Sequence, residues 1–340
     1  MDNSVFLQRL RDASLEEGRS YIQGHREELA DHTAIGDLLA NEALKCLYTP
    51  FLSLKLAELL TFFGESAHDE YSHALGLKAK GDAFVQIRHL QAAIQALDTA
   101  GEKFLRLSDK RNWARSRISW VVAAASLGHI EEALHDAARA REIFQELGEP
   151  YWVCVIDHNT AWIYRQIGRY RDAIVLYERM LMIYPAVIDQ SDTYIKRAIA
   201  MAKESQVVIL SWLGDFEQAR RLQQEVHAAF SALAETDLIV NAEIELAELD
   251  YAQGYYGSAL RQYYQAQDRF IEGNMNNPRV LAELKMRMAD TLVKLSRANE
   301  ACQLAAEAVA IFRRLDESLD MGNVLREYAP TSCATRWRKC

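Results

Sequence analysis

The sequence predicts an all-α fold, a solenoid built from antiparallel helix pairs, and three observations support that prediction. Alanines recur in one register, at Ala93, Ala133, Ala173, Ala219, Ala259 and Ala301. Each alanine lies five residues after a turn-like position, and sixteen residues after that position stands an aromatic residue: Phe104, Phe144, Tyr184, Phe230, Phe270 and Phe312. Internal repetition of this kind is the signature of a solenoid whose units contact only their neighbours.

The turn-like positions divide much of the chain into six repeats. These positions are Arg88, Gly128, Gly168, Gly214, Gly254 and Ser296. The steps between them are 40, 40, 46, 40 and 42 residues. The step of 46 residues contains an extra segment, at about 186–192, whose role the pattern does not indicate.

The unit around Gly168 explains why each repeat is expected to be a helix pair. From Trp152 to Tyr164, apolar residues recur at three- and four-residue spacing, which is typical of an amphipathic helix. Glycine then supplies the turn. The apolar stripe resumes at Ala173 and is expected to end at Pro185, because proline breaks helices. We therefore expect two antiparallel helices joined at Gly168.

The recurring alanine has a steric explanation. Helices that cross closely need small side chains at the point of contact. The first helix of each unit carries mostly small residues seven positions before the turn: Gly81, Val121, Ala161, Val207, Ala247 and Ala289. We expect the two helices of each pair to meet at these small residues.

The repeated units resemble the tetratricopeptide repeat (TPR) family. The unit at Gly168 matches that family's pattern at Ala161, Tyr164, Gly168, Tyr170, Ala173, Tyr177 and Pro185. The unit at Gly254 is similar, at Ala247, Tyr256, Ala259, Tyr263 and Ala266. The family's usual period is about 34 residues, and these longer units resemble the TPR regions of MalT-like regulators and of CHAT-associated proteins. The resemblance implies a right-handed superhelical solenoid.

The resemblance also gives a division into three regions. Residues 1–65 lack the alanine register, and we interpret them as divergent N-terminal helices, a first pair plus a capping helix. Residues 66–320 are interpreted as six TPR-like helix-pair repeats. Residues 321–340 are interpreted as the end of the last helix and a short basic tail.

The composition excludes several classes of protein. A formal net charge of −9 over 340 residues disfavours nonspecific attraction to nucleic acid or to an anionic membrane. No apolar run reaches the ~18 residues that span a bilayer, and the N-terminus lacks a signal-peptide layout. An odd number of cysteines, five, suits reduced thiols. We expect a cytoplasmic protein, with nucleic-acid binding through Arg111, Arg115 and Arg117 as a weaker alternative.

The residues with reactive side chains form no catalytic or metal-binding pattern. The chain has no glycine-rich phosphate loop and no HExxH array. His68 and His73 are five residues apart, which does not place both imidazoles on one helical face. Cys154 and His158 share a face, but a core thiol beside a groove histidine is the simpler interpretation. We therefore expect no enzymatic activity, no cofactor and no metal.

What remains is a surface for binding. In TPR arrays the first helices of successive pairs line a concave groove that binds peptides or partner helices. The resemblance places candidate partner-binding residues in that groove: Lys78, Arg115, His158, Trp162, Arg165, Gln166, Glu204, Trp212, Asn241, Glu245, Glu248 and Tyr251. The aromatic residues of this set are either interaction hot spots or packing residues between adjacent first helices.

One known ligand mode of the family is disfavoured. Its carboxylate-binding members hold the C-terminus of a partner with lysine, asparagine and arginine on three consecutive first helices. Lys78 matches the first lysine, but Asp82 and Ser119 replace the expected asparagines. An aspartate there would repel a carboxylate.

The sequence therefore predicts a non-enzymatic scaffold that binds a peptide or protein segment in the groove of the solenoid. The alternative is a ligand-sensing regulatory region of a larger signalling or transcription-regulator protein, which the long units and the basic tail suggest. The partner, the biological process and the oligomeric state are not encoded in the pattern.

Overall fold

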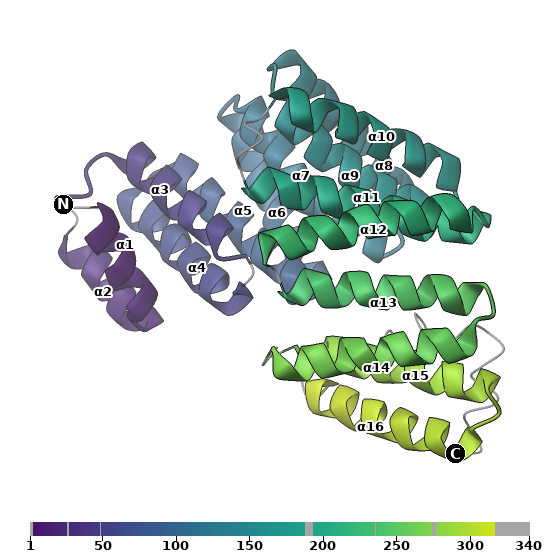
Figure 1. Cartoon of the computed structure of the whole chain (residues 1–340). Coiled ribbons are helices and arrows are strands. Elements are labelled where there is room, and N and C mark those ends of the chain that lie inside the picture. The colour runs from purple at the N-terminus through teal and green to yellow at the C-terminus, as the bar shows by residue number, and fades with distance from the viewer. Residues whose placement is uncertain are drawn as a thin grey trace. The chain divides into compact units, whose positions relative to one another are not determined.

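The computed structural model describes residues 3–25, 27–47, 49–187, 193–234, 236–273 and 277–316. Sixteen helices lie in these ranges, which contain no strand, so the predicted all-α class is confirmed (Figure 1). The chain divides into two compact units, residues 1–187 and 188–340. Residues 188–192 of the predicted extra segment and the tail at 321–340 lie outside the described residues.

Unit 1 contains the first ten helices. They are α1 (Asn3–Asp12), α2 (Leu15–Gly24), α3 (His32–Lys45), α4 (Pro50–Ala67), α5 (Glu70–Gln86), α6 (Leu90–Arg106), α7 (Lys110–Ser126), α8 (Ile130–Glu146), α9 (Pro150–Gln166) and α10 (Tyr170–Val187). The pairs α5–α6, α7–α8 and α9–α10 turn at three of the predicted positions, Arg88, Gly128 and Gly168. Helix α10 ends at Val187, two residues past Pro185, where the sequence predicted its end.

Unit 2 contains the remaining six helices. They are α11 (Thr193–Leu213), α12 (Phe216–Leu233), α13 (Thr236–Ala252), α14 (Tyr256–Glu272), α15 (Pro278–Lys294) and α16 (Ala298–Asp316). The pairs α11–α12, α13–α14 and α15–α16 turn at the other three predicted positions, Gly214, Gly254 and Ser296. Each helix of a pair packs along its partner.

The N-terminal region has four helices where the sequence analysis expected a pair and a cap. A capping box separates α1 from α2, since the Ser14 hydroxyl accepts from the Glu17 amide and the Glu17 carboxylate accepts from the Ser14 amide. Both short helices pack on α4 and bury Phe6 and Ile22. A capped break therefore makes two short helices from a stretch that lacks the repeat register.

The turns within the helix pairs all use left-handed backbone. The four glycines have φ between 78° and 93°, and Arg88 and Ser296 have φ of 64° and 62°. A left-handed residue ends a helix and lets the chain reverse, and glycine adopts it without the penalty that a side chain brings. The turn geometry is thus the same in all six pairs, although two of them do without glycine.

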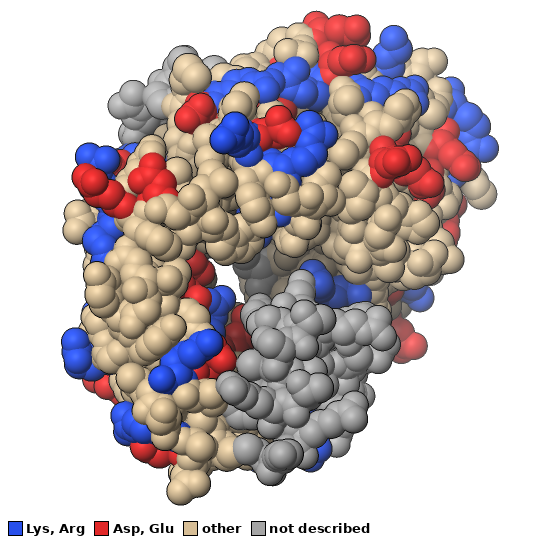
Figure 2. All heavy atoms as spheres, turned by 90° about the vertical axis from the view of Figure 1, so that its right-hand side faces the viewer, with Lys and Arg blue, Asp and Glu red and all other residues tan. Residues whose placement is uncertain are grey.

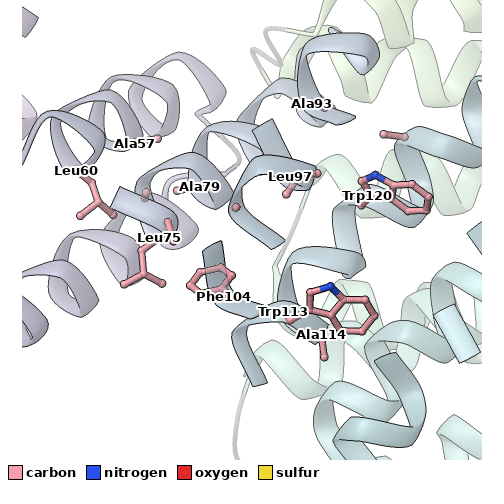
Figure 3. Packing of buried hydrophobic residues seen from close by; sticks show 14 of the residues in the cluster. Ala57, Leu60, Leu75, Ala79, Ala93, Leu97, Phe104, Trp113, Ala114 and Trp120 are labelled. Atoms are coloured by element: carbon pink, nitrogen blue, oxygen red, sulfur yellow. The ribbon is translucent and has the colours of Figure 1, made fainter. Parts of the chain in front are cut away.

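Small residues hold the two helices of each pair together. The six register alanines are at most 1% exposed, and their first-helix counterparts are buried as well. At Gly81 the two helices leave no room for a side chain, because an added Cβ would lie 2.4 Å from the Leu97 Cγ atom. Figure 3 shows this packing in unit 1, with Leu97 and Phe104 of α6 among apolar side chains of neighbouring helices.

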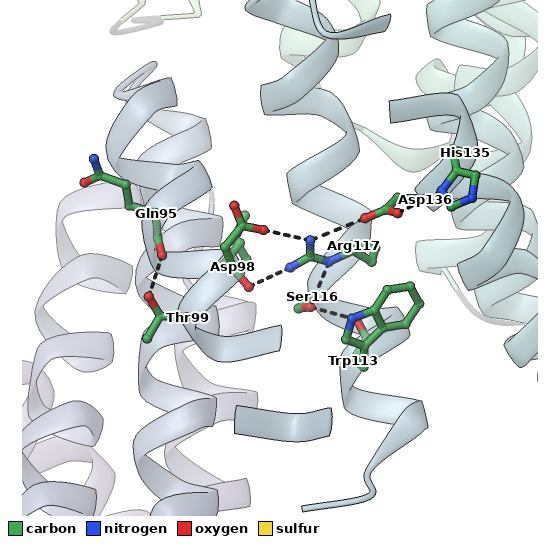
Figure 4. Close-up of polar contacts among 9 residues, drawn as sticks. Gln95, Asp98, Thr99, Trp113, Ser116, Arg117, His135 and Asp136 are labelled. Carbon is green, nitrogen blue, oxygen red and sulfur yellow. Dashed lines mark hydrogen bonds and ion pairs between the residues drawn. The ribbon is translucent and has the colours of Figure 1, made fainter. Parts of the chain in front are cut away.

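A second register carries charge instead of apolar side chains. Eleven residues before the turn, five first helices bear a charge whose sign alternates along the chain: Arg117, Asp157, Lys203, Glu243 and Lys285. Each is paired with an opposite charge on a second helix. The most elaborate case is the buried Arg117, whose guanidinium lies 2.9 Å from Asp98 and 3.5 Å from Asp136 (Figure 4). These pairs connect neighbouring helices at one level of the stack.

The turn geometry predicts opposite effects for two substitutions. Gly168→Ala should lower the free energy of unfolding by about 1 kcal/mol, because the added Cβ has open space but a left-handed backbone. Arg88→Gly should raise it by up to about 1 kcal/mol, because relief of the left-handed strain exceeds the entropy cost of glycine. Urea unfolding followed by circular dichroism measures both. Equal effects of the two substitutions would contradict the shared geometry.

The charge register predicts that a reversed pair restores stability. The Lys285 ammonium lies 2.7 Å from the Glu307 carboxylate. Lys285→Glu alone should destabilise unit 2, because it places two carboxylates together. Adding Glu307→Lys should recover about 0.5–1 kcal/mol of the loss. A double variant no more stable than Lys285→Glu would show that the pair contributes nothing.

Candidate functional site

The first helices of unit 1 share one surface. Helices α3, α5, α7 and α9 pack against each other in this order, and we call the surface that they share the first-helix face. A recess opens on it between α3, α5 and α7. Its charged and amide side chains are Asp37, Asn41, Lys78, Asp82, Asn112 and Arg115. Two of the predicted groove residues, Lys78 and Arg115, therefore line one recess.

A hydrogen-bond chain joins the three helices at this recess. The Tyr71 hydroxyl of α5 donates to Asp37 of α3 over 2.8 Å, and the Asn112 amide nitrogen of α7 donates to the Tyr71 oxygen over 3.4 Å. The same amide nitrogen donates to Asp109 over 2.7 Å. Burial and the neighbouring Asp37 raise the pKa of Tyr71 to about 12, so its hydroxyl stays protonated. These contacts fix the orientation of the Asn112 side chain.

Two buried oxygens of the recess are left without a donor. Asn112 is 6% exposed, and its Oδ1 atom has no hydrogen-bond partner among the described residues. Asp82 is equally buried, and its Oδ2 atom accepts from Lys78 over 2.6 Å, whereas its Oδ1 atom has no partner in the described part of the chain. Buried polar atoms are nearly always paired in folded proteins. These oxygens can accept hydrogen bonds from a bound segment.

Arg115 supplies the complementary donor. Its guanidinium stacks on the Trp152 ring of α9 at 4.7 Å, and its buried Nε atom has no hydrogen-bond partner within the described ranges. Burial lowers the pKa of Arg115, and the nearby Arg111 lowers it further. Arg111 is paired with Glu149 at 2.5 Å. The recess thus has one donor and two acceptors without partners among the described residues, on the two neighbouring helices α5 and α7.

The other predicted residues of unit 1 lie on α9 in different settings. The His158 ring packs edge-on against the buried Tyr177 of α10, with 5.7 Å between centroids. Trp162 is partly buried and packs against the hydrophobic core. Arg165 is partly buried, and Gln166 is exposed at the end of the helix. For Trp162, the structure therefore favours the packing interpretation.

The predicted residues of unit 2 are engaged to different degrees. Glu248 pairs with Arg287 of α15 at 2.5 Å and accepts from the Tyr263 hydroxyl of α14. The Tyr251 hydroxyl donates to Asp290 of α15. Glu204, Asn241 and Glu245 are partly buried, and Trp212 is 55% exposed. Glu248 and Tyr251 therefore connect helices within the stack, while Trp212 presents its ring to solvent.

The candidate set omitted several residues of the recess. It did not include Asn112, although Asn112 lies one turn before Arg115. That spacing along the helix is the signal that could have found it. Trp152, which stacks on Arg115, was seen only as part of an apolar stripe.

The weaker alternatives find little support in the geometry. Of the three arginines considered for nucleic acid, Arg117 is buried among carboxylates and Arg111 is paired with Glu149. Figure 2 shows basic and acidic side chains interspersed on the visible face. No described helix has the length and apolar character of a membrane span, and no metal-binding cluster of His, Cys, Asp and Glu occurs in those same residues.

Two described cysteines, Cys46 and Cys154, are free and buried. Burial raises the pKa of Cys154 to about 12, which makes it an unreactive thiol. Cys154 therefore fits a core thiol better than a nucleophile activated by His158.

Comparison with solved structures identifies the fold. A Rap protein complexed with Competence and Sporulation Factor matches with a TM-score of 0.63 and 14% identity, over 82% of this chain and 75% of that one. NprR in complex with its cognate peptide NprX matches with a TM-score of 0.59 and 17% identity, over 87% and 86%. No protein-family model matches, and a comparison with curated proteins finds no match.

A third neighbour is larger than this chain. It is a signal transduction ATPase with numerous domains (STAND) protein with a tetratricopeptide repeat sensor, from Pyrococcus horikoshii. It matches with a TM-score of 0.52 and 14% identity, over 92% of this chain and 51% of its own. At these identities the similarity shows the fold alone, which is a TPR-like helical solenoid.

The setting of His158 predicts an acid sensitivity. Burial, reinforced by Arg165, lowers its pKa to about 4, so the ring is neutral in the folded protein at pH 7. The unfolded chain binds a proton near pH 6.5, so this contribution to stability is present above that pH and is lost as the pH falls toward 4. His158→Phe keeps the ring contact with Tyr177 but cannot titrate. Its stability should fall less than that of the wild type between pH 7 and pH 4.5, measured by urea unfolding. Parallel losses would contradict the prediction.

Proposed function

We propose that this protein is a non-enzymatic interaction module that binds an extended peptide or protein segment on the first-helix face of unit 1. The observation that carries the proposal is the set of buried, unmatched polar atoms at the recess: Asp82 Oδ1, Asn112 Oδ1 and Arg115 Nε. Desolvated groups of this kind destabilise a protein unless a partner completes their hydrogen bonds.

A peptide main chain has the complementary chemistry. Each residue other than proline offers one N–H donor and one carbonyl acceptor. An N–H group fits the oxygens of Asp82 and Asn112, and a carbonyl fits the Nε atom of Arg115. The charges of Lys78 and Arg111 are offset by Asp82 and Glu149. The recess is therefore suited to reading a backbone rather than a highly charged side chain.

Structural neighbours support a peptide ligand. The Rap protein is seen in complex with Competence and Sporulation Factor, and NprR in complex with its cognate peptide NprX. The resemblance is one of fold, so it makes peptide binding a proposal for this chain. The unmatched atoms of its own recess supply the independent argument.

The second candidate function is that of a ligand-sensing region in a larger regulatory protein, of MalT-like or CHAT-associated type. The STAND neighbour favours it, because that protein carries a TPR sensor and this chain spans 51% of it. Both candidates use the same surface. They differ in whether binding alone is the output or whether binding is passed on to an effector.

The proposed function is tested with a peptide display library selected on the full chain. Peptides enriched on the wild type should bind Asn112→Leu and Arg115→Met about tenfold more weakly, corresponding to ~1.4 kcal/mol. Lys110→Met is the matched control, because Lys110 is an exposed cation on the same helix outside the recess. Methylation of single backbone amides in the peptide should reproduce the loss.

Circular dichroism must first show that the variants are folded. Peptides that bind both recess variants as tightly as the wild type would contradict the proposed site. A failure to enrich any peptide would contradict the proposed function.

A further inference from the structure

A second, separate cavity lies in unit 2, where α12 and α14 flank α13. Its volume is about 330 Å³, within the range of small-molecule sites. Four glutamines line it, Gln223 and Gln224 from α12 and Gln262 and Gln265 from α14, together with His227 of α12 and Glu243 of α13. Ala242 and Leu246 of α13 give it an apolar side. None of these residues belongs to the first-helix face described above.

Gln223 is one of the residues that line this cavity, and its amide is held in a fixed orientation. The residue is 1% exposed, and its Nε2 atom donates to the Ala242 carbonyl oxygen over 2.5 Å. That bond determines which end of the amide is the oxygen. The Oε1 atom is buried and has no hydrogen-bond partner in the part of the chain that the structure describes. A buried amide oxygen in this position calls for a donor.

Gln262 resembles Gln223, because its amide nitrogen is hydrogen-bonded and its amide oxygen, within the described residues, is not. Its Nε2 atom donates to Asp250 Oδ2 over 2.7 Å and approaches the Ser258 hydroxyl at 3.4 Å. Its Oε1 atom is buried and, among the described residues, unpartnered. Both cavity glutamines have therefore committed their donors to the protein and keep their acceptors for something else.

The charges near the cavity are already compensated. Glu243 lies 2.9 Å from the Arg269 guanidinium and 3.8 Å from the His227 ring. Asp250 is paired with Arg220 at 2.6 Å. A ligand thus needs no net charge, and a carboxylate ligand would place its oxygens against two amide oxygens. The lining favours a neutral molecule with donors.

We propose that this cavity is a binding site for a small neutral molecule that carries amide-type N–H donors. Two N–H groups would bind the oxygens of Gln223 and Gln262, and the body of the molecule would lie against Leu246. The site is independent of peptide binding on unit 1, since its residues and its ligand chemistry differ. The chain would then bind two ligands, one on unit 1 and one on unit 2.

Water is the competing occupant. Water also donates hydrogen bonds, and a cavity of this size has room for several molecules, each taking about 30 Å³ in the liquid. Water binds without regard to the donor pattern of an added compound. A matched series of compounds therefore separates the two possibilities.

The test uses the full chain with its glutamine side-chain amides labelled with ¹⁵N, titrated with three probes of similar size. Benzamide is neutral and has two N–H donors, N,N-dimethylbenzamide has none, and benzoate offers acceptors only. Benzamide should shift the side-chain resonances of Gln223 and Gln262 saturably. The other two probes should bind at least tenfold more weakly.

Three variants complete the test. Gln223→Met should weaken benzamide binding about tenfold. Leu246→Trp should abolish it by filling the cavity without changing either glutamine. Gln267→Met is the control, since Gln267 also has a buried, unpartnered oxygen but lies outside the cavity lining, and it should bind as the wild type does.

The proposal would be overturned by any of three results. Benzamide could leave the two resonances unshifted, which means a cavity that holds water only. N,N-dimethylbenzamide could bind as tightly as benzamide, or Leu246→Trp could bind normally while folded. None of these outcomes bears on the peptide selection, so the two proposals fail separately.

Discussion

The close approach of two helices at small side chains is the constraint on which the rest of this structure depends. In each of the six repeat pairs the second helix carries a buried alanine, and the first helix carries a buried glycine, alanine or valine seven residues before the turn. The helices are then close enough for the next layer of aromatic residues to fill the space around them, as Phe104 and Phe144 do. Because these residues recur every 40 to 46 positions, each repeat has the same faces in the same order.

Because of this repetition, apolar and charged side chains occupy separate registers. The apolar register builds the core, and the charged register eleven residues before each turn joins first helices to second helices through pairs of alternating sign. Outside these two registers, some buried polar atoms have no hydrogen-bond partner among the described residues. The recess at Asp82, Asn112 and Arg115 is one such place, and the glutamine-lined cavity of unit 2 is another. We propose binding at these two places because their buried polar atoms lack hydrogen-bond partners within the described residues.

The periodic part of the structure could be predicted from the sequence, because small residues and turns repeat at fixed spacing. Arg88 and Ser296 were identified as turns by register, and both have left-handed backbone although neither is glycine. The separation of α1 from α2 could not be predicted in this way, since it depends on the local capping box at Ser14. Pro185 was predicted as the end of its helix, which continues to Val187.

The candidate site was less predictable than the fold. Register placed Lys78 and Arg115 on one face, but it could not tell which polar atoms neighbouring helices would satisfy. Tyr251 and Glu248 were candidates by position and are bonded to α15 and α14, whereas Asn112 was overlooked and keeps a buried oxygen unmatched. Whether a polar atom has a hydrogen-bond partner depends on how the helices pack. The pattern of residue types along the sequence does not give that packing.

The most direct test of this account is a crystal structure of the chain with a library-selected peptide bound. The account predicts main-chain N–H groups of the peptide on the oxygens of Asp82 and Asn112, and a peptide carbonyl on the Nε atom of Arg115. A peptide seated elsewhere, with none of those three atoms hydrogen-bonded to it, would contradict it.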